Sequence, residues 1–297
     1  AIAFGMIAGI TSFAIGCNWL VLSEYKGDSA HAIKENKTYQ VLNELQHSGE
    51  YLHNKEILPY RIAFNDNYYN YGMMHYLPSR MSFISLVSSS IDEFYDALGT
   101  PRKTNSPWGP NGTNTLLSTR YYEMLNENEN LHLLEKKNNG NRDIYLYEDT
   151  TALPIGFSYD SYITDEELNL VPLENKAYVA LTALVVPKNS EDEIKKILPH
   201  AGIHITGNKV SEDEIQREKI KHLAESGYDF NYDTNGFRMR IKVQGKKYAF
   251  FSVPYSKQWQ AVVNEKTAQI IDSIGMMAIP LEDGLNEIQF TYSASLS

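Results

Sequence analysis

Residues 250–292 decide the fold of the C-terminal half, and they read FFSVPYSKQWQAVVNEKTAQIIDSIGMMAIPLEDGLNEIQFTY. Short apolar runs in this stretch are separated by turn-forming residues, a pattern that is typical of antiparallel β-strands. Glu282-Asp283-Gly284 predicts a tight turn between the last two strands, and Gly245-Lys246 predicts another turn just upstream. The strands expected in this half cover residues 203–206, 237–244, 247–253, 259–264, 268–272, 276–280 and 286–292. A series of short strands with frequent turns favours a β-sandwich.

A charged helix is expected to interrupt these strands at residues 211–226, SEDEIQREKIKHLAES. Ser211 followed by Glu214 is the pattern of a capping box, which satisfies free amide groups at the start of a helix. Trp259 follows PYSKQ and precedes a strand. We therefore expect its large aromatic ring to pack in the core of the sandwich.

The upstream half mixes helices and strands. Capping residues and helical spacing predict helices over 28–55 and 90–98 and a helix-like segment over 165–185. Strands are expected at 60–64, 131–135, 143–148 and 152–163, and 116–125 reads as a strand or a helix. We therefore predict an α+β fold, with a mixed α/β domain over 24–165 and an antiparallel β-sandwich domain with a helical insertion over 166–297.

The N-terminal residues 1–22 carry no charge, and Glu24 is the first charged residue. About 20 apolar residues can span a bilayer as a helix. A signal peptide would begin with basic residues and end in small ones, whereas this stretch has no basic residue and ends in Trp-Leu-Val-Leu. A buried helix is the remaining alternative. We expect residues 1–23 to be the end of a transmembrane helix, and the chain to be a fragment of a longer protein.

The composition excludes some classes of protein. A net charge of −10 argues against nucleic-acid binding and against electrostatic attraction to anionic lipid, because both require a basic face. A length of 297 residues is enough for about two domains with cores of their own. Cys17 is the single cysteine, so a disulfide within the chain is impossible. A domain of this size needs none, even outside the cell.

The sequence contains no motif of a known catalytic site, since G-x-S-x-G, P-loop, G-x-G-x-x-G and H-E-x-x-H are all missing. The carboxylates concentrate in charged segments such as 191–196 and 211–219, for which a solvated helix face is the simplest explanation. Only the fold can bring two distant carboxylates together for glycoside hydrolysis. His200 and His204 lie in a strand-like segment rather than on one helix face. We assign no catalytic residue and no metal site.

Two loops rich in aromatic and turn-forming residues hold candidate substrate contacts. In SPWGPNG, two prolines and two glycines surround Trp108, whose indole can stack on a sugar face or else cover the domain core or rest on the membrane part. The stretch 68–76, YYNYGMMHY, suggests a polar-aromatic wall or an interdomain contact. The candidate substrate-binding residues are Trp108, Asn111, Tyr69, Tyr71, His75 and Arg80. Arg61, Arg80 and Arg120 can each grip a phosphate, although a structural ion pair is the simpler explanation.

Several segments carry a resemblance to a known family by their order and spacing. They are SFISLVSSSIDEFYDALG at 82–99, LLSTRYYEML at 116–125, DIYLYEDTTALPIGFSYDSYI at 143–163, FFSVPYSKQW and GMMAIPLEDGLNEIQFTY. This series resembles the YfhO-type bacterial membrane proteins over most of residues 20–297, most strongly over 247–292. In AVVNEKTAQII, Asn264-Glu265 stands where the family often has Asp-Gly, which weakens the turn signal.

The resemblance implies a multi-span glycosyltransferase that moves a sugar from a polyprenyl-phosphate carrier to a cell-envelope polymer such as lipoteichoic acid. It implies that the soluble part of this chain lies on the extracellular face of the cell membrane and shapes the donor or acceptor site. The expected partners are the protein's remaining membrane helices, the lipid-linked sugar and the envelope polymer, and not nucleic acid. The catalytic carboxylate of that class would lie outside this chain, so the chain alone is expected to be inactive and to hold no cofactor.

Two other readings remain open at this point. A noncatalytic carbohydrate-binding or scaffold module of the cell envelope fits a β-sandwich beside an aromatic loop equally well. A free secreted hydrolase would require a pair of carboxylates at hydrolytic spacing and turnover by this chain alone.

Overall fold

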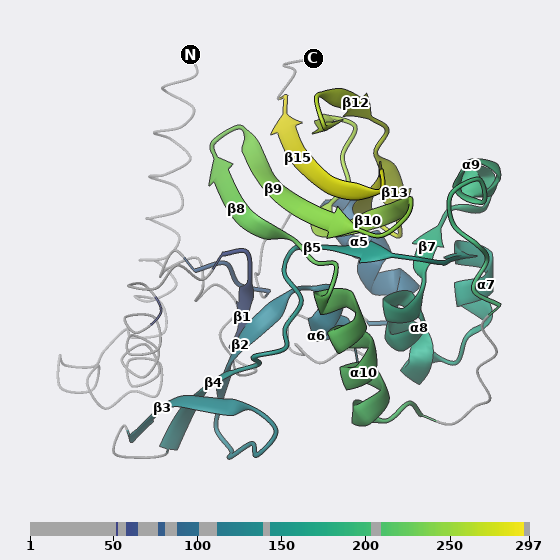
Figure 1. Cartoon of the computed structure of the whole chain (residues 1–297). Helices are drawn as coiled ribbons and strands as arrows, with labels where there is room; N and C mark the ends of the chain where they lie inside the picture. Colours follow the sequence, from purple (N-terminus) through teal and green to yellow (C-terminus); the bar gives the residue numbers. More distant parts are fainter. Residues whose placement is uncertain are drawn as a thin grey trace, which may run out of the picture. The chain divides into compact units, whose positions relative to one another are not determined.

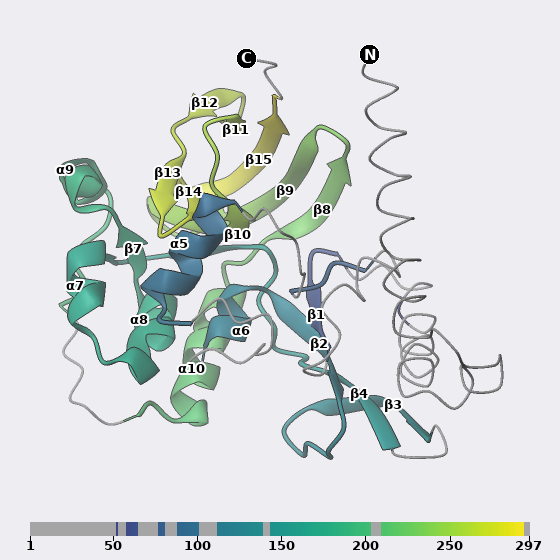
Figure 2. The ribbon, with the colours of Figure 1, turned by 180° about the vertical axis from the view of Figure 1, so that it is seen from behind.

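Strands predominate over helices in this α+β fold, since 42% of the residues that the structure describes are in strands and 25% are in helices. Figures 1 and 2 show the computed structural model from two opposite sides. The structure describes residues 52, 58–64, 77–80, 88–100, 112–138, 143–202 and 209–293. All of them belong to one unit, Gly49–Ser297. The predicted helix at 28–55 and membrane helix at 1–23 lie outside these residues, apart from Leu52.

Two antiparallel sheets form the expected β-sandwich, with strand orders β13-β14-β10-β5 and β12-β11-β15-β9-β8 (Figure 1). The strands of the first sheet are β5 (Gly156–Tyr159), β10 (Lys247–Pro254), β13 (Ile271–Ser273) and β14 (Met276–Leu281). Those of the second are β8 (Tyr228–Asp233), β9 (Gly236–Val243), β11 (Trp259–Val263), β12 (Lys266–Ala268) and β15 (Gly284–Tyr292). Alternate residues of β9 are buried and exposed. The buried set, with Met239 and Ile241, meets Phe251, Ile279 and Phe290 in one apolar core.

The sandwich sheet β13-β14-β10-β5 is covered on both faces, so β10 is buried through its middle, from Tyr248 to Ser252. Its second face packs against helices in another apolar cluster, which includes Phe94, Leu181, Ile215 and Phe250. The helices are α5 (Ser89–Ala97), α6 (Thr113–Leu116), α7 (Asp165–Leu170), α8 (Lys176–Thr182), α9 (Glu191–Ile194) and α10 (Glu212–Leu223). Two 3₁₀ turns, η1 (Leu173–Asn175) and η2 (Lys188–Ser190), and a parallel pair of strands, β6 (Tyr162–Thr164) and β7 (Leu184–Val186), connect them.

The local sequence accounts for the start of α10. The Ser211 side chain accepts a hydrogen bond from the Glu214 amide at 3.3 Å, and the Glu214 carboxylate accepts one from the Ser211 amide at 2.9 Å. This is the predicted capping box, which pairs two amide groups that the helix leaves free. Three acidic residues in the first turn also favour this end of the helix dipole.

A separate mixed sheet has the order β1-β2-β4-β3 and lies on the other side of α10 from α7 and α9 (Figure 1). Its strands are β1 (Arg61–Ala63), β2 (Thr119–Met124), β3 (His132–Asn138) and β4 (Asp143–Glu148). Arg61 joins this sheet to the sandwich, because its Nη1 donates to Leu117 O at 2.9 Å and to Ser252 Oγ at 2.8 Å, and its Nη2 donates to Ser252 O at 2.6 Å. Burial lowers the pKa of Arg61 to about 10. The expected ion pair is therefore replaced by neutral acceptors at this arginine.

Several strand predictions differ from the structure. The stretch 152–163 is expected as one strand, but β5 joins the sandwich and β6 pairs with β7, which forms at the end of the segment expected to be helix-like over 165–185. The stretch 268–272 is also expected as one strand, but β12 and β13 divide it between the two sheets, so the chain crosses the sandwich here. The strand β8 is not predicted at all. It is an edge strand whose residues are mostly exposed, so its sequence lacks the alternation of a half-buried strand. The predicted strand 203–206 lies outside the described residues.

Neither the membrane helix nor the domain boundary is decided by the described residues. None of the helices described is long and apolar enough to cross a bilayer. The boundary predicted between residues 165 and 166 stays a prediction, and β5, which precedes it, pairs with β10, which follows it.

Candidate functional site

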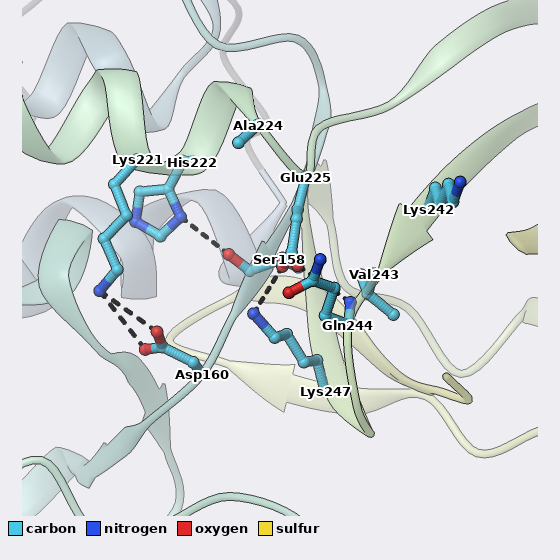
Figure 3. A pocket seen from close by; sticks show the side chains of 10 residues that line it. All are labelled: Ser158, Asp160, Lys221, His222, Ala224, Glu225, Lys242, Val243, Gln244 and Lys247. Atoms are coloured by element: carbon cyan, nitrogen blue, oxygen red, sulfur yellow. Dashed lines mark hydrogen bonds and ion pairs between the residues drawn. The ribbon is translucent and has the colours of Figure 1, made fainter. Parts of the chain in front are cut away.

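A hollow of about 390 Å³ lies where β5, the end of α10 and the turn between β9 and β10 meet (Figure 3). We call it the charged cleft, because most of its side chains are charged or polar. It is lined by Ser158, Asp160, Lys221, His222, Ala224, Glu225, Lys242, Val243, Gln244 and Lys247.

The backbone around the charged cleft is held by close contacts between β5 and the segment after α10. The Ser158 amide donates to Glu225 O at 3.1 Å, and the Gly227 amide donates to Gly156 O at 2.8 Å. Both glycines face the Met239 side chain, and a Cβ would lie 2.8 Å from its Sδ at Gly156 and 2.1 Å from its Cε at Gly227. A side chain at Gly227 would therefore displace the flexible end of Met239, and one at Gly156 would also meet the Phe251 ring at 2.8 Å, so the two segments pack closely where both residues are glycine.

Glu225 is the centre of the hydrogen bonds in the charged cleft. Its carboxylate accepts from Lys247 Nζ at 2.6 Å, from Ser158 Oγ at 2.8 Å and from the Gln244 amide at 3.0 Å. Burial raises the pKa of Glu225, but these three donors outweigh burial and lower the pKa below its ordinary value. An ionised carboxylate with three donors holds no proton at neutral pH, so Glu225 positions its neighbours rather than acting as an acid.

The other lysines of the charged cleft are more exposed. Lys221 lies 3.4 Å from Asp160 in an exposed ion pair. Lys242 projects from the outer face of β9 and stands apart from the other side chains in Figure 3. Within the described part of the chain, Lys242 takes part in no ion pair. One ammonium group is thus available to a ligand, and the Lys221 pair is solvated enough to exchange partners.

His222 supports the cleft from behind and is only 4% exposed. Its Nδ1 lies 2.8 Å from Ser158 O and its Nε2 lies 2.7 Å from Leu181 O, so the ring connects β5 with the end of α8. The rings of Phe157 and Tyr159 lie 4.9 and 4.8 Å from the imidazole, centre to centre. Burial lowers the pKa of His222, and the two carbonyls act in the opposite direction. A ring held in this way orders the cleft but is not accessible to a substrate.

Of the candidate substrate-binding residues from the sequence, only Arg80 is among the described residues, and it does not line the charged cleft. Trp108, Asn111, Tyr69, Tyr71 and His75 lie outside the described residues, so their role in binding stays a prediction. Arg80 is described and half-buried, and its amide donates to Ile62 O at 3.1 Å beside β1.

Of the other two arginines considered for phosphate binding, Arg120 forms the expected structural ion pair, 2.7 Å from Glu148. It also lies over the Tyr60 ring at 4.6 Å from its centre. Sequence reasoning missed the lining residues of the charged cleft. The one feature of the sequence that could have indicated these residues is the group of lysines around Gly245, namely Lys242, Lys246 and Lys247, in a chain with a net charge of −10.

Comparison with known proteins identifies the family. A family model described as bacterial membrane protein YfhO matches residues 2–226 and 213–296. No curated protein and no solved structure matches the chain. Because the family matches span nearly the whole chain, including every residue of the charged cleft, the chain belongs to the YfhO family of bacterial membrane proteins, with a membrane-associated role in the cell envelope.

Proposed function

We propose that this chain is the extracytoplasmic region of a membrane glycosyltransferase, in which the charged cleft receives an anionic envelope polymer as the acceptor. The enzyme would transfer a sugar from a polyprenyl-phosphate carrier to a polymer such as lipoteichoic acid. The remaining membrane helices of the same protein would carry the donor and the catalytic carboxylate. The region described here would hold the acceptor on the extracellular face of the membrane.

The observation that carries this proposal is the concentration of lysines in the charged cleft. The whole chain has a net charge of −10, yet Lys221, Lys242 and Lys247 line one hollow with only two carboxylates, Asp160 and Glu225. Lys242 is left for a ligand, and the Gln244 side chain, which lies near Glu225 in Figure 3, offers the same hollow an amide donor and acceptor. Ammonium groups and amides are suited to the phosphates and hydroxyls of a polyol-phosphate chain.

The same geometry favours binding over chemistry in this region. Glu225 accepts from three donors, and His222 is buried with both ring nitrogens held within 2.8 Å of backbone carbonyls. Neither is free to abstract or supply a proton. This agrees with a catalytic group that lies elsewhere in the full protein, and we expect no turnover by the chain alone.

The proposal is tested first by binding. The purified chain is titrated with a glycerol-phosphate oligomer, and wild type is compared with Lys242→Glu. Removing and then reversing one exposed charge costs roughly 1–2 kcal/mol, so we expect affinity to fall by about 5- to 30-fold, and wild-type binding to weaken as salt is raised. Lys196→Glu is the matched control, since Lys196 is an exposed lysine just after α9 and far from the cleft in sequence.

The proposal is tested next in cells. The full-length gene is deleted, and the sugar content of purified lipoteichoic acid is read by NMR after complementation with wild type, Lys242→Glu or Lys196→Glu. Restoration by wild type and Lys196→Glu, with loss for Lys242→Glu, would support an acceptor cleft. A polymer whose sugar content is unchanged by the deletion would rule out this acceptor. Equal restoration by both variants would remove the charged cleft from the proposal.

A further inference from the structure

A row of aromatic side chains crosses one end of the five-stranded sheet of the sandwich, on the face that packs against the core. We call it the aromatic row, and it consists of Phe230 and Tyr232 on β8, Phe237 on β9, Trp259 on β11, and Phe290 and Tyr292 on β15. Tyr232 and Phe290 each lie opposite Phe237 in register, and Tyr292 lies opposite Trp259. Residues that lie directly opposite in antiparallel strands share a face, as do residues two apart in one strand, so these rings lie on one face. The arrowheads of β8 and β15 in Figure 1 point to this end of the sheet.

Neighbouring rings of the aromatic row are in contact across four strands. The Phe237 ring lies 5.8 Å from Phe230 and 5.9 Å from Trp259, centre to centre. Tyr232 lies 6.2 Å from Phe230 at one end of the row, and Tyr292 lies 5.0 Å from Trp259 at the other. Aromatic pairs at these separations stabilise one another, so the row is fixed before any partner arrives.

The aromatic row extends beyond the core of the sandwich. Phe290 is only 1% exposed, whereas Tyr232 is 64% and Tyr292 is 40% exposed. Trp259 packs against the sandwich core as expected, but it is only half-buried. The open members are thus Tyr and Trp, which combine an apolar ring with a polar O–H or N–H group. A contiguous exposed patch of such rings indicates a binding surface.

The two ends of this sheet differ in charge. The segments at the aromatic end, 232–237, 255–259 and 290–293, hold two charged residues, Asp233 and Lys257. The carboxylate of Asp233 accepts from the amides of Asn235 and Gly236 within its own turn. The turns at the opposite end, 244–247, 264–266 and 282–284, hold Lys246, Lys247, Glu265, Lys266, Glu282 and Asp283. The aromatic end is therefore nearly neutral, whereas the end that carries the charged cleft is strongly polar.

A bilayer surface fits the aromatic end better than a glycan does. Tyr and Trp are the residues that concentrate at the interface between lipid and water, and the chain belongs to a family of membrane proteins. The near neutrality of this end limits the repulsion that a net charge of −10 causes at anionic lipid. Trp259 meets Phe237 at 72° and Tyr292 at 69°, so the rings do not form the flat platform on which a sugar would stack.

We propose that the aromatic row lies in the interface of the lipid bilayer, with Tyr232, Trp259 and Tyr292 among the lipid headgroups. This contact orients the region. The eight residues of β9 lead from the aromatic end to the charged cleft, which is thereby held up to about 26 Å from the bilayer surface. The contact goes beyond the acceptor role of the charged cleft and does not depend on it.

Fluorescence of single-tryptophan variants tests where the aromatic row lies. The full chain is reconstituted in phosphatidylcholine vesicles with and without dibrominated lipid, after Trp19→Phe and Trp108→Phe leave Trp259 as its only tryptophan. Two further variants combine Trp259→Phe with Tyr232→Trp or with Tyr228→Trp. We expect brominated lipid to quench Trp259 and the Tyr232→Trp variant at least about 3-fold more strongly than the Tyr228→Trp variant. Bromine quenches at contact, and interfacial side chains lie about 5–10 Å deep, at the boundary of headgroups and acyl chains.

Tyr228→Trp is the matched control, because Tyr228 lies on the same strand as Tyr232 and is 45% exposed, but it lies opposite Arg240 on the outer face of the sheet. Equal quenching of the two variants, or quenching of Trp259 by aqueous iodide but not by brominated lipid, would overturn the proposal. Protection of Trp259 from both quenchers would overturn it in favour of a protein partner. Lys242→Glu should leave the quenching of Trp259 unchanged, so failure of the acceptor proposal and failure of this one are distinguishable.

Discussion

Lys219 and Lys221 provide a direct test of what burial does to an ion pair on one helix. Both lie on α10, and each pairs with an aspartate, Lys219 with Asp149 at 2.5 Å and Lys221 with Asp160 at 3.4 Å. The side chains of the first pair are 5% and 14% exposed, and those of the second are 49% and 45% exposed. We expect Lys219→Met to destabilise the protein strongly and Lys221→Met to have little effect.

The magnitudes follow from the surroundings of the two carboxylates. Removal of one partner from a buried pair leaves an uncompensated charge and costs about 3–5 kcal/mol, whereas an exposed pair contributes about 0–1 kcal/mol. Asp149 would keep hydrogen bonds from the Thr151 amide at 3.0 Å and hydroxyl at 2.7 Å, so we take the lower value of about 3 kcal/mol. In a unit of this size that loss lowers Tm by about 6–12 °C.

The assay is thermal and urea unfolding of wild type, both Met variants and the double variant Lys219→Met with Asp149→Asn. The double variant should regain most of the lost stability, because no unpaired charge remains. Equal losses for the two Met variants, or a double variant as unstable as Lys219→Met, would refute the reasoning. Since α10 carries His222 and ends beside Glu225, a confirmed result would also establish what holds the back wall of the charged cleft.

Two further predictions concern backbone strain and acidity. Asn264 and Glu265 both have positive φ, +49° and +66°, so Glu265→Gly should raise the free energy of unfolding by up to about 1 kcal/mol. Gly245 has φ +72° and open space around it, so Gly245→Ala should lower the free energy of unfolding by about 1 kcal/mol through backbone strain alone. Urea midpoints measure both changes, and a change of the opposite sign at either position would contradict the argument from backbone strain. At Glu167, burial raises the pKa, but hydrogen bonds from His200 and from Thr164 at the helix cap outweigh burial and lower the pKa to about 2. The stabilisation that the ionised Glu167 gives the folded state is therefore fully present above the unfolded pKa near 4.5, and it is lost as pH falls through about 2. With 44% of the side chain exposed, that contribution is at most about 1 kcal/mol, and Glu167→Gln should remove it from the stability profile between pH 5 and 2; an unchanged profile would show that this pair contributes nothing.

The sequence predicts features that depend on neighbouring residues. The capping box at Ser211 and Glu214, the end of α5 before Gly99 and most strands of the sandwich follow from spacing along the chain, whereas the exposed edge strand β8 does not. The turn at Asn264-Glu265 forms although it lacks the Asp-Gly of a standard turn, because β11 and β12 are paired on either side and impose the positive φ values. Local signals are sufficient where local structure and the fold agree.

The charged cleft depends on hydrogen-bonded residues that are distant from one another in sequence, so no local sequence signal identifies it. Glu225 and Lys247 are brought together only when β10 follows β9 back past the end of α10, and Ser158 reaches the same carboxylate from the other side. The sequence likewise predicts Trp259 as a core residue, and its half-buried position depends on where the second sheet ends. Trp108 and the stretch 68–76 lie outside the described residues, so their role in binding stays a prediction.

The strand β10 holds the charged cleft rigid on one side. Its first residue, Lys247, lines the cleft, and its next five residues, from Tyr248 to Ser252, are buried. Because a strand buried on both faces is close-packed, this wall of the cleft cannot adjust to a ligand as a loop would. A ligand of the charged cleft must therefore fit the positions of Lys247 and Glu225 as they stand, whereas the exposed side chain of Lys242 can follow it.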